Sequence, residues 1–174
     1  MRATISVDNY RYHDYIVPVA RALQAEIKQR KPFASPQAEA FVNLQRTADR
    51  LLGGVEKTLK REGLSPTQYN VLRILRGSAP DGLACREVGD RMITRDPDIT
   101  RLLDRLETQG LISRARDTGD RRVVRTKITA KGVAILRRLD EPVEGLHQRQ
   151  LGHLSAKQLR TLCTLLDAAR EKAL

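Results

Sequence analysis

The chain has 174 residues, of which 40% are apolar and 30% charged, and a formal net charge of +11. This composition favours a helix-rich globule with a buried core, and the excess of Lys and Arg favours nucleic acid or an acidic membrane surface as partner. No apolar run reaches transmembrane length and no signal-peptide core is visible, so we expect a cytoplasmic protein without a membrane partner. The absence of Trp and the 3% aromatic content argue against stacking platforms for single strands.

Residues 1–33 are expected to form an N-terminal extension with a short helix that opens at Pro18. This helix is too short to fold alone, so we expect it to lie on the main body or on a second subunit. Ser35 and Pro36 open a long helix with a capping residue followed by proline. We assign residues 34–63 to dimerisation.

Residues 64–128 carry the signals of a helix-turn-helix module. Ser65 and Gln68 have the spacing of a capping box, and a short helix is expected from about Ala84 to Met92. In the next helix Asp96 is the expected N-cap and Pro97 the first helical residue. Its apolar stripe comprises Ile99, Leu102, Leu103 and Leu106, and its opposite face is polar. Two short helices joined by a tight turn have the helix-turn-helix layout.

A basic β-hairpin follows directly, with a polar turn over residues 117–120. Between Arg114 and Lys127 there are six Lys or Arg and two Asp, a net charge of +4. Folding does not require like charges to face each other across a hairpin, so we interpret the charge as a binding surface for an anion. The helix would enter the major groove of double-stranded DNA and the hairpin would follow the phosphates and the minor groove. The alternative is a solvated charged face.

Residues 129–174 are expected to form C-terminal dimerisation helices. Thr129 caps the first, in which Pro142 should cause a bend or a break, and Ser155 with Gln158 opens the last. The terminal helices have more apolar face than the central module covers, which favours a homodimer over a compact monomer. The predicted fold class is therefore mainly α, an α+β winged helix-turn-helix with a two-stranded β wing and N- and C-terminal dimerisation helices.

Four segments in this order carry a family resemblance: SPTQYNVLRIL, DITRLLDRLETQGLISR, RDTGDRRVV and KITAKG. With the flanking helices they resemble the MarR family of bacterial transcriptional regulators over roughly Phe33 to Leu174. The resemblance implies winged-helix homodimers that bind palindromic operators and often respond to small aromatic or phenolic ligands. We therefore expect a repressor that a small molecule relieves, and the alternative is a sequence-tolerant protein that coats DNA.

The resemblance also implies roles for residues of the reading helix. Asp98, Thr100 and Arg101 would lie at its groove-facing end, and Arg95 and Arg105 would hold phosphates. The turn at residues 95–98 is unusually acidic for a DNA-facing loop. An aspartate there repels phosphate unless it accepts from a cytosine amino group or braces Arg101, so direct base reading by Asp98 is in question.

In the wing, Asp120 and Arg121 match the family's Asp-Arg hallmark. The resemblance implies that Asp120 orients a neighbouring arginine while Arg121 or Arg122 enters the minor groove, where the negative potential attracts a guanidinium. Arg116 is counted with these residues as part of the DNA-binding set. The alternatives are an ordinary turn-forming role for Asp120 and a solvent-facing strand position for Arg122.

Other kinds of site find little support in the sequence. There is no phosphate loop, nucleophile motif or paired acid and base, so we expect no enzyme and no cofactor. The three histidines have no metal-ligand spacing. Cys85 opens the first helix of the helix-turn-helix, where a redox role is an alternative, and Cys163 lies in a leucine stripe and is expected in the core. An effector pocket would lie between the dimer helices and the reading module, lined by the long helix and the helix from Ser65.

Overall fold

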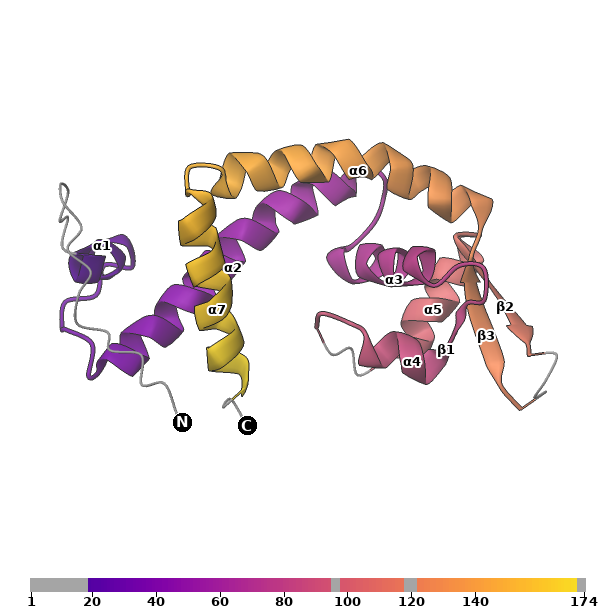
Figure 1. Ribbon diagram of the computed structural model, residues 1–174, viewed down its shortest axis with the longest axis horizontal. Coiled ribbons are helices and arrows are strands. Elements are labelled where there is room, and N and C mark those ends of the chain that lie inside the picture. The colour runs from indigo at the N-terminus through magenta and orange to yellow at the C-terminus, as the bar shows by residue number, and fades with distance from the viewer. Residues whose placement is uncertain (1–18, 95–97, 118–121, 172–174) are drawn as a thin grey trace. The chain divides into compact units, whose positions relative to one another are not determined.

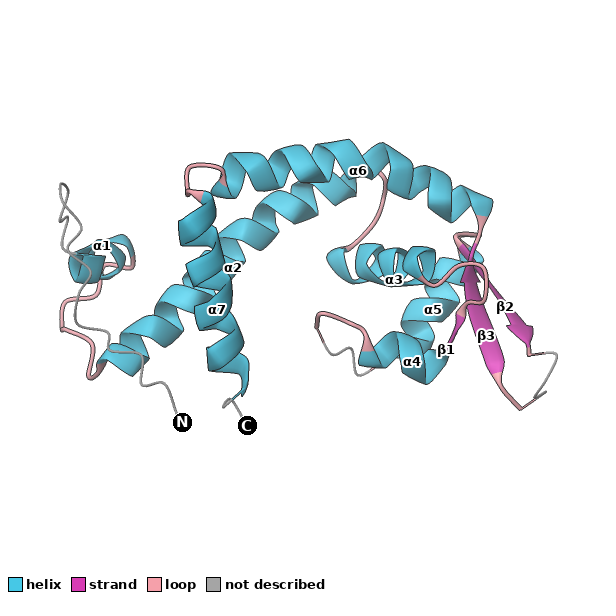
Figure 2. Ribbon diagram, in the orientation of Figure 1, coloured by secondary structure: helices cyan, strands magenta, loops and turns pink. Residues whose placement is uncertain are grey.

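The structure is a computed structural model that describes residues 19–94, 98–117 and 122–171, without the side chains of residues 19–22. The described chain is mainly helical with one small antiparallel sheet, which confirms the predicted fold class (Figures 1 and 2). None of the described helices is long and apolar enough to cross a membrane. The elements are α1 (Val19–Glu26), α2 (Pro36–Lys60), α3 (Pro66–Gly77), β1 (Leu83–Ala84), α4 (Cys85–Asp90), α5 (Ile99–Thr108), β2 (Ile112–Arg116), β3 (Val124–Ile128), α6 (Ala130–Leu151) and α7 (Ala156–Glu171).

The chain divides into two compact units, Met1–Arg50 and Leu51–Leu174. In the first unit, Glu26 at the end of α1 accepts a hydrogen bond from Arg46 Nε at 2.9 Å and lies 3.4 Å from Arg50 Nη1. Both arginines belong to α2. These contacts join α1 to the first part of the long helix by charge.

Helix α3 begins as its sequence predicts. Gln68 N donates to Ser65 Oγ at 3.2 Å and Ser65 N donates to Gln68 Oε1 at 2.9 Å, so the capping box is confirmed. Pro66 occupies the first turn, where the amide hydrogen that it lacks would have no helical partner. The helix ends at Gly77 and buries Tyr69, Val71, Leu72 and Leu75.

Helix α6 also begins at its predicted cap, but it does not break at Pro142. Gly132 N donates to Thr129 Oγ1 at 3.2 Å, and the helix runs on through Pro142 to Leu151. Of the predicted bend or break at Pro142, the break does not occur. Proline removes one helical hydrogen bond, whereas Leu139 and Val143 on either side of it are buried in the core and hold both halves of the helix in place.

The sheet has three strands in the order β1-β3-β2, one strand more than the predicted wing. Ile112 pairs with Ile128 and Arg116 with Val124, so β2 and β3 form the expected hairpin. The additional strand β1 has two residues and pairs antiparallel with β3. A strand of two residues has too little alternation to be recognised in a sequence, and its pairing partner lies about forty residues further along the chain.

One apolar cluster in the second unit holds α3, α4, α5, α6 and the sheet together. Its fully enclosed side chains are Leu59, Val71, Leu72, Leu75, Val88, Leu103, Leu106 and Leu136. At the rim, Arg76 of α3 donates to both carboxylate oxygens of Asp140 on α6, at 2.8 and 2.9 Å. This bidentate hydrogen bond lowers the pKa of Asp140 against the opposing effect of desolvation.

Helix α7 opens with its predicted capping box, but it buries no residue within this chain. Leu162 and Leu165 are exposed, and so is Cys163. The prediction that Cys163 belongs to the core is therefore wrong for the single chain. The leucine stripe of α7 has the right periodicity for burial, but nothing in the described part of this chain covers it.

Two helical glycines provide a matched test of the packing. A Cβ on Gly132 would lie 2.4 Å from Leu111 O and 2.7 Å from Ile128 Cγ1, whereas a Cβ on Gly89 would meet nothing within 4 Å. We expect Gly132→Ala to lower the free energy of unfolding by about 2 kcal/mol through overpacking. Gly89→Ala should raise it by about 0.5 kcal/mol, since alanine favours a helix. Urea denaturation of both variants measures these changes, and equal effects would contradict the packing described between α6 and the sheet.

Candidate nucleic-acid interface

Helix α5 begins two residues later than the sequence predicted. Its N-cap is Asp98, whose carboxylate accepts from Arg101 N at 3.3 Å, and its first residue is Ile99. The expected cap Asp96 and first residue Pro97 lie outside the described residues, and the start assigned to them is wrong. Asp98 is the N-cap because its carboxylate reaches the third amide of the helix, while Ile99, the first helical residue, packs against the core.

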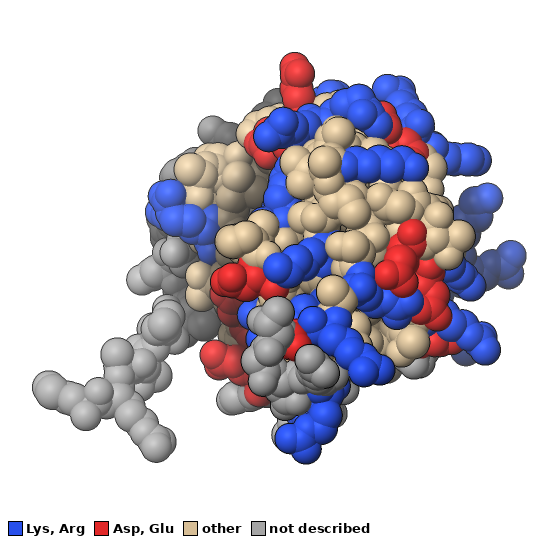
Figure 3. Space-filling model, turned by 90° about the vertical axis from the view of Figure 1, so that its right-hand side faces the viewer, with Lys and Arg blue, Asp and Glu red and all other residues tan. Residues whose placement is uncertain are grey.

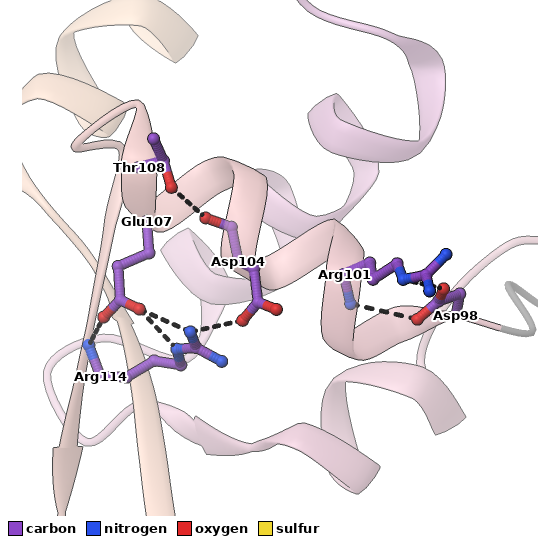
Figure 4. Close-up of polar contacts among 6 residues, drawn as sticks. All are labelled: Asp98, Arg101, Asp104, Glu107, Thr108 and Arg114. Carbon is purple, nitrogen blue, oxygen red and sulfur yellow. Dashed lines mark hydrogen bonds and ion pairs between the residues drawn. The ribbon is translucent and has the colours of Figure 1, made fainter.

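Asp98 has a second contact that orients an arginine. Arg101 Nε lies 3.1 Å from Asp98 Oδ2, and the two side chains are 78% and 47% exposed. An ion pair this open contributes little to stability, and in the structure it places the guanidinium beside the Asp98 carboxylate (Figure 4). The bracing contact that the sequence allowed for Asp98 is thus present.

The described members of the predicted DNA-binding set all have open surroundings. Thr100, Arg101 and Arg105 are exposed on α5, and Arg116 and Arg122 are exposed on or beside the hairpin. Arg95, Asp120 and Arg121 lie outside the described residues. The three described residues of α5 share the helix with its buried stripe, Leu102, Leu103 and Leu106, which fixes their outward direction.

Arg101 and Arg105 also line a polar hollow of about 240 Å³ between α5 and the start of α3. Ser65 and Thr67 contribute hydroxyl groups to the same hollow. The sequence predicts a capping role for Ser65 and does not indicate that it lies beside α5. No local signal could have made that connection, because the two helices meet only through tertiary packing.

Part of the positive charge of the hairpin is paired with carboxylates of the protein itself. Arg114 pairs with Asp104 and Glu107 of α5, each at 2.6 Å, and Arg125 pairs with Asp117 within the hairpin. These hydrogen bonds raise the pKa of both arginines above the ordinary value. The expectation that folding makes no use of the hairpin charges is therefore wrong for these two residues. Arg116 and Lys127 remain exposed on the strands.

Figure 3 shows the face of the molecule that carries the sheet. Lys and Arg side chains cover much of it, and acidic side chains lie among them in smaller groups. The paired arginines and their acids account for part of this mixture. The surface is thus basic, with local patches where acidic side chains offset the positive charge.

A second cavity of about 250 Å³ lies on the other side of α3. It is lined by Leu52 and Val55 of α2, by Pro66, Thr67, Tyr69, Asn70 and Arg73 of α3, by Ile93 and Thr94, and by Val143 and His147 of α6. The sequence placed a pocket against the long helix and the helix from Ser65, and this cavity has both walls. It did not foresee the walls from α6 and from the segment before α5.

Two polar contacts join residues that line this cavity. The guanidinium of Arg73 lies 5.9 Å from the centre of the Tyr69 ring, within the range of a cation–π contact. Asn70 Oδ1 accepts from Ile93 N at 2.9 Å, which ties α3 to the segment that leads into α5. The wall of the cavity is therefore linked directly to the approach to the reading helix.

The remaining candidates for chemistry are weak in the described residues. His147 and His153 are both exposed, as expected, and no cluster of three metal-binding side chains occurs in the described part of the chain. Cys85 is partly buried and packs against the apolar cluster. The redox role considered for Cys85 stays an untested hypothesis.

The comparisons with known proteins agree on one family. The model of the MarR family matches residues 64–124. The HTH-type transcriptional regulator MhqR from Bacillus subtilis is 32% identical over 98 residues, which is 55% of this chain. The match spans 65% of that relative's length.

Solved structures show the same likeness over a longer stretch. A MarR transcription factor from Planctomyces limnophilus is 43% identical with a TM-score of 0.60, over 78% of this chain and 98% of the other. A mutant of MarR from E. coli complexed with operator DNA is 28% identical with a TM-score of 0.65, over 84% and 97%. The PcaV transcriptional regulator from Streptomyces coelicolor, in complex with its natural ligand, is 28% identical with a TM-score of 0.61, over 73% and 91%.

The double contact of Asp98 can be separated into its parts by two substitutions. Asp98→Ala removes both the cap and the ion pair, and we expect it to lower the free energy of unfolding by about 1 kcal/mol. Asp98→Asn keeps an acceptor for the helix amide and should lower the free energy of unfolding by only a few tenths of a kcal/mol, since the exposed ion pair contributes little. Denaturant titration of the two variants tests this order, and an equal loss in both would mean that charge rather than capping dominates.

Proposed function

We propose that this chain, which belongs to the MarR family of DNA-binding transcriptional regulators, acts in the cytoplasm as a homodimeric repressor. It would bind a palindromic operator and release it when a small aromatic ligand enters the cavity beside α3. One observation carries the DNA-binding part: α5 is rotated by its buried leucines so that Arg101, braced by Asp98, and Arg105 point away from the core.

A helix with this arrangement suits the major groove of double-stranded DNA. The groove is about 12 Å wide and admits one helix, and a planar guanidinium can donate two hydrogen bonds to guanine. Arg101 is restrained in orientation before binding, which lowers the entropy lost when it contacts a base edge. Arg105 would hold a phosphate, with Thr100 at the same groove-facing end. In the wing, Arg116 and Arg122 would follow the backbone and the minor groove, joined by Asp120 and Arg121.

The exposed apolar side chains support a homodimer. Phe41, Leu44 and Leu52 are 61%, 44% and 50% exposed on α2, and Leu165 is 63% exposed on α7. Isolated exposed apolar residues are common, but repeated ones along a helix mark an interaction surface. A second copy of the chain would cover these faces and place two reading helices on half-sites one DNA turn apart, roughly 34 Å.

The cavity beside α3 supports regulation by a small ligand. Its walls combine apolar side chains such as Leu52, Val55 and Val143 with Arg73 and His147, a combination that suits an aromatic ring bearing an acidic group. At about 250 Å³ it suits a small molecule. A ligand there would contact Ile93 and Thr94, whose segment leads into α5, so occupancy would bias the position of the reading helix.

The preference for a specific sequence tests the repressor proposal. We expect the protein to bind DNA from upstream of its own gene about a thousandfold more tightly than scrambled DNA of equal length at near-physiological salt. If a dimer neutralises about eight phosphates, affinity should fall by roughly four decades between 50 and 200 mM salt. Fluorescence anisotropy measures both. Equal affinity for the two DNAs would support the alternative of a sequence-tolerant coating protein, and a flat salt response would contradict both readings.

Melting temperature tests the ligand proposal. A small aromatic acid that binds only the native protein should stabilise it by about 2.7 kcal/mol at a hundredfold excess over its dissociation constant. Screening benzoate, salicylate and their uncharged amides by thermal shift, with Arg73→Gln as the matched variant, separates charge from shape. The acids should raise the melting temperature of the wild type more than that of the variant. Failure of every aromatic acid to shift the wild type would contradict this ligand class.

A further inference from the structure

Arg114 is the arginine of the hairpin that has the most contacts with α5 (Figure 4). Its Nε and Nη2 atoms donate to Glu107 Oε2 at 2.8 and 2.6 Å, and Nη2 also donates to Asp104 Oδ1 at 2.6 Å. The other oxygen of Glu107 accepts from the backbone N of Arg114 at 3.1 Å. Glu107 therefore binds both the side chain and the main chain of β2.

This cluster joins the two elements that the proposed function sends into adjacent grooves. Helix α5 ends just before Gly110, which has a φ of +69°, and β2 begins at Ile112. Strand β2 is an outer strand of the sheet, so its outer edge has no neighbouring strand to receive its amides. Glu107 of α5 accepts one amide of that edge, the backbone N of Arg114. It thereby connects the base of the hairpin to the helix that precedes Gly110.

The charges of the cluster argue against a phosphate at Arg114. Two carboxylates surround one guanidinium, and the Arg114 side chain is only 26% exposed. The hydrogen bond to Glu107, with a further one to Asp104, raises the pKa of Arg114. A DNA phosphate would have to displace these carboxylates or approach them closely, and both are unfavourable. Arg116, two residues along the same strand, is exposed and has no such partners among the described residues.

We propose that Arg114 is a positioning residue: with Glu107 and Asp104 it locks the wing to the reading helix at one spacing, and it does not itself contact DNA. The proposal rests on the proposed function, because a fixed spacing matters only if both elements bind one duplex. Since groups that bind a rigid target must be held to within about half an ångström, loss of the lock should reduce specific binding more than non-specific binding.

Substitution of Glu107 offers a test, because a purely electrostatic role and a positioning role predict opposite changes in operator affinity. Glu107→Ala removes a negative charge next to the DNA-binding surface, so electrostatics alone would tighten binding. The positioning role predicts instead that affinity for the operator falls by about tenfold, a coupling of ordinary size between contacting residues. The matched control is Asp90→Ala, which removes an equally negative and 72% exposed side chain from α4. Affinity of the control for the operator should stay equal or rise.

Arg114 itself separates a contact from a lock through the salt response. Arg114→Ala should weaken operator binding by about tenfold while leaving the slope of log affinity against log salt unchanged. Arg116→Ala removes a positive charge from the same strand and should lower that slope by about 0.9. The double variant Glu107→Ala with Arg114→Ala should bind no more weakly than either single variant, because both remove one lock.

Circular dichroism and melting temperature establish that each variant folds. If an alanine variant does not fold, Glu107→Gln removes the same charge while keeping an acceptor for the β2 amide, and the same opposite signs apply to it. Tighter operator binding by the Glu107 variants, as in Asp90→Ala, would overturn the proposal, as would a loss of slope by about 0.9 in Arg114→Ala. Absence of any operator preference in the wild type would refute the proposed function instead.

Discussion

The burial of one side of α5 is the constraint on which the rest of this structure depends. Leu103 and Leu106 are completely enclosed and Leu102 nearly so, and together they fix the rotation of the helix about its axis. With that rotation set, Arg101 and Arg105 can only point outward. The same packing holds the end of the helix against β2, so the apolar core determines the direction of the cations and the place where the hairpin leaves the helix.

Part of the positive charge in this protein is used in structural ion pairs. Arg114 pairs with carboxylates of α5, and Arg125 pairs with Asp117 of the hairpin. The pairs Arg76–Asp140 and Arg138–Glu62 join α6 to earlier parts of the second unit. Arg105 of α5 and Arg116 and Lys127 of the hairpin are exposed, and the proposed function assigns such exposed cations to DNA. Net charge alone therefore overstates the binding surface, since part of the positive charge is neutralised where elements meet.

The apolar surface shows a similar division. The central module encloses its leucines well, whereas α7 buries none of its residues and α2 exposes several large ones. Such faces are expected on helices that are completed by a second copy of the chain. The cavity beside α3, which Leu52 and Val55 of α2 help to line, combines an apolar wall with Arg73 and His147. Ile93 and Thr94, which precede α5, line this cavity too, and the proposed regulation depends on that contact.

The sequence by itself determined most of the elements and the family. Capping pairs such as Ser65 with Gln68, the leucine stripe of α5 and the alternating hairpin are local patterns, and each was confirmed because short-range contacts decide them. Tertiary structure decided what depends on distant neighbours. The pairing of β1 with β3 has no local signature. The hydrogen bond from Arg114 to Glu107 has none either, because a carboxylate seven residues away becomes a partner only where the chain passes from the helix into the strand. The exposure of Cys163 and the continuity of α6 through Pro142 likewise depend on tertiary packing around these residues. Residue spacing in the sequence does not indicate that packing.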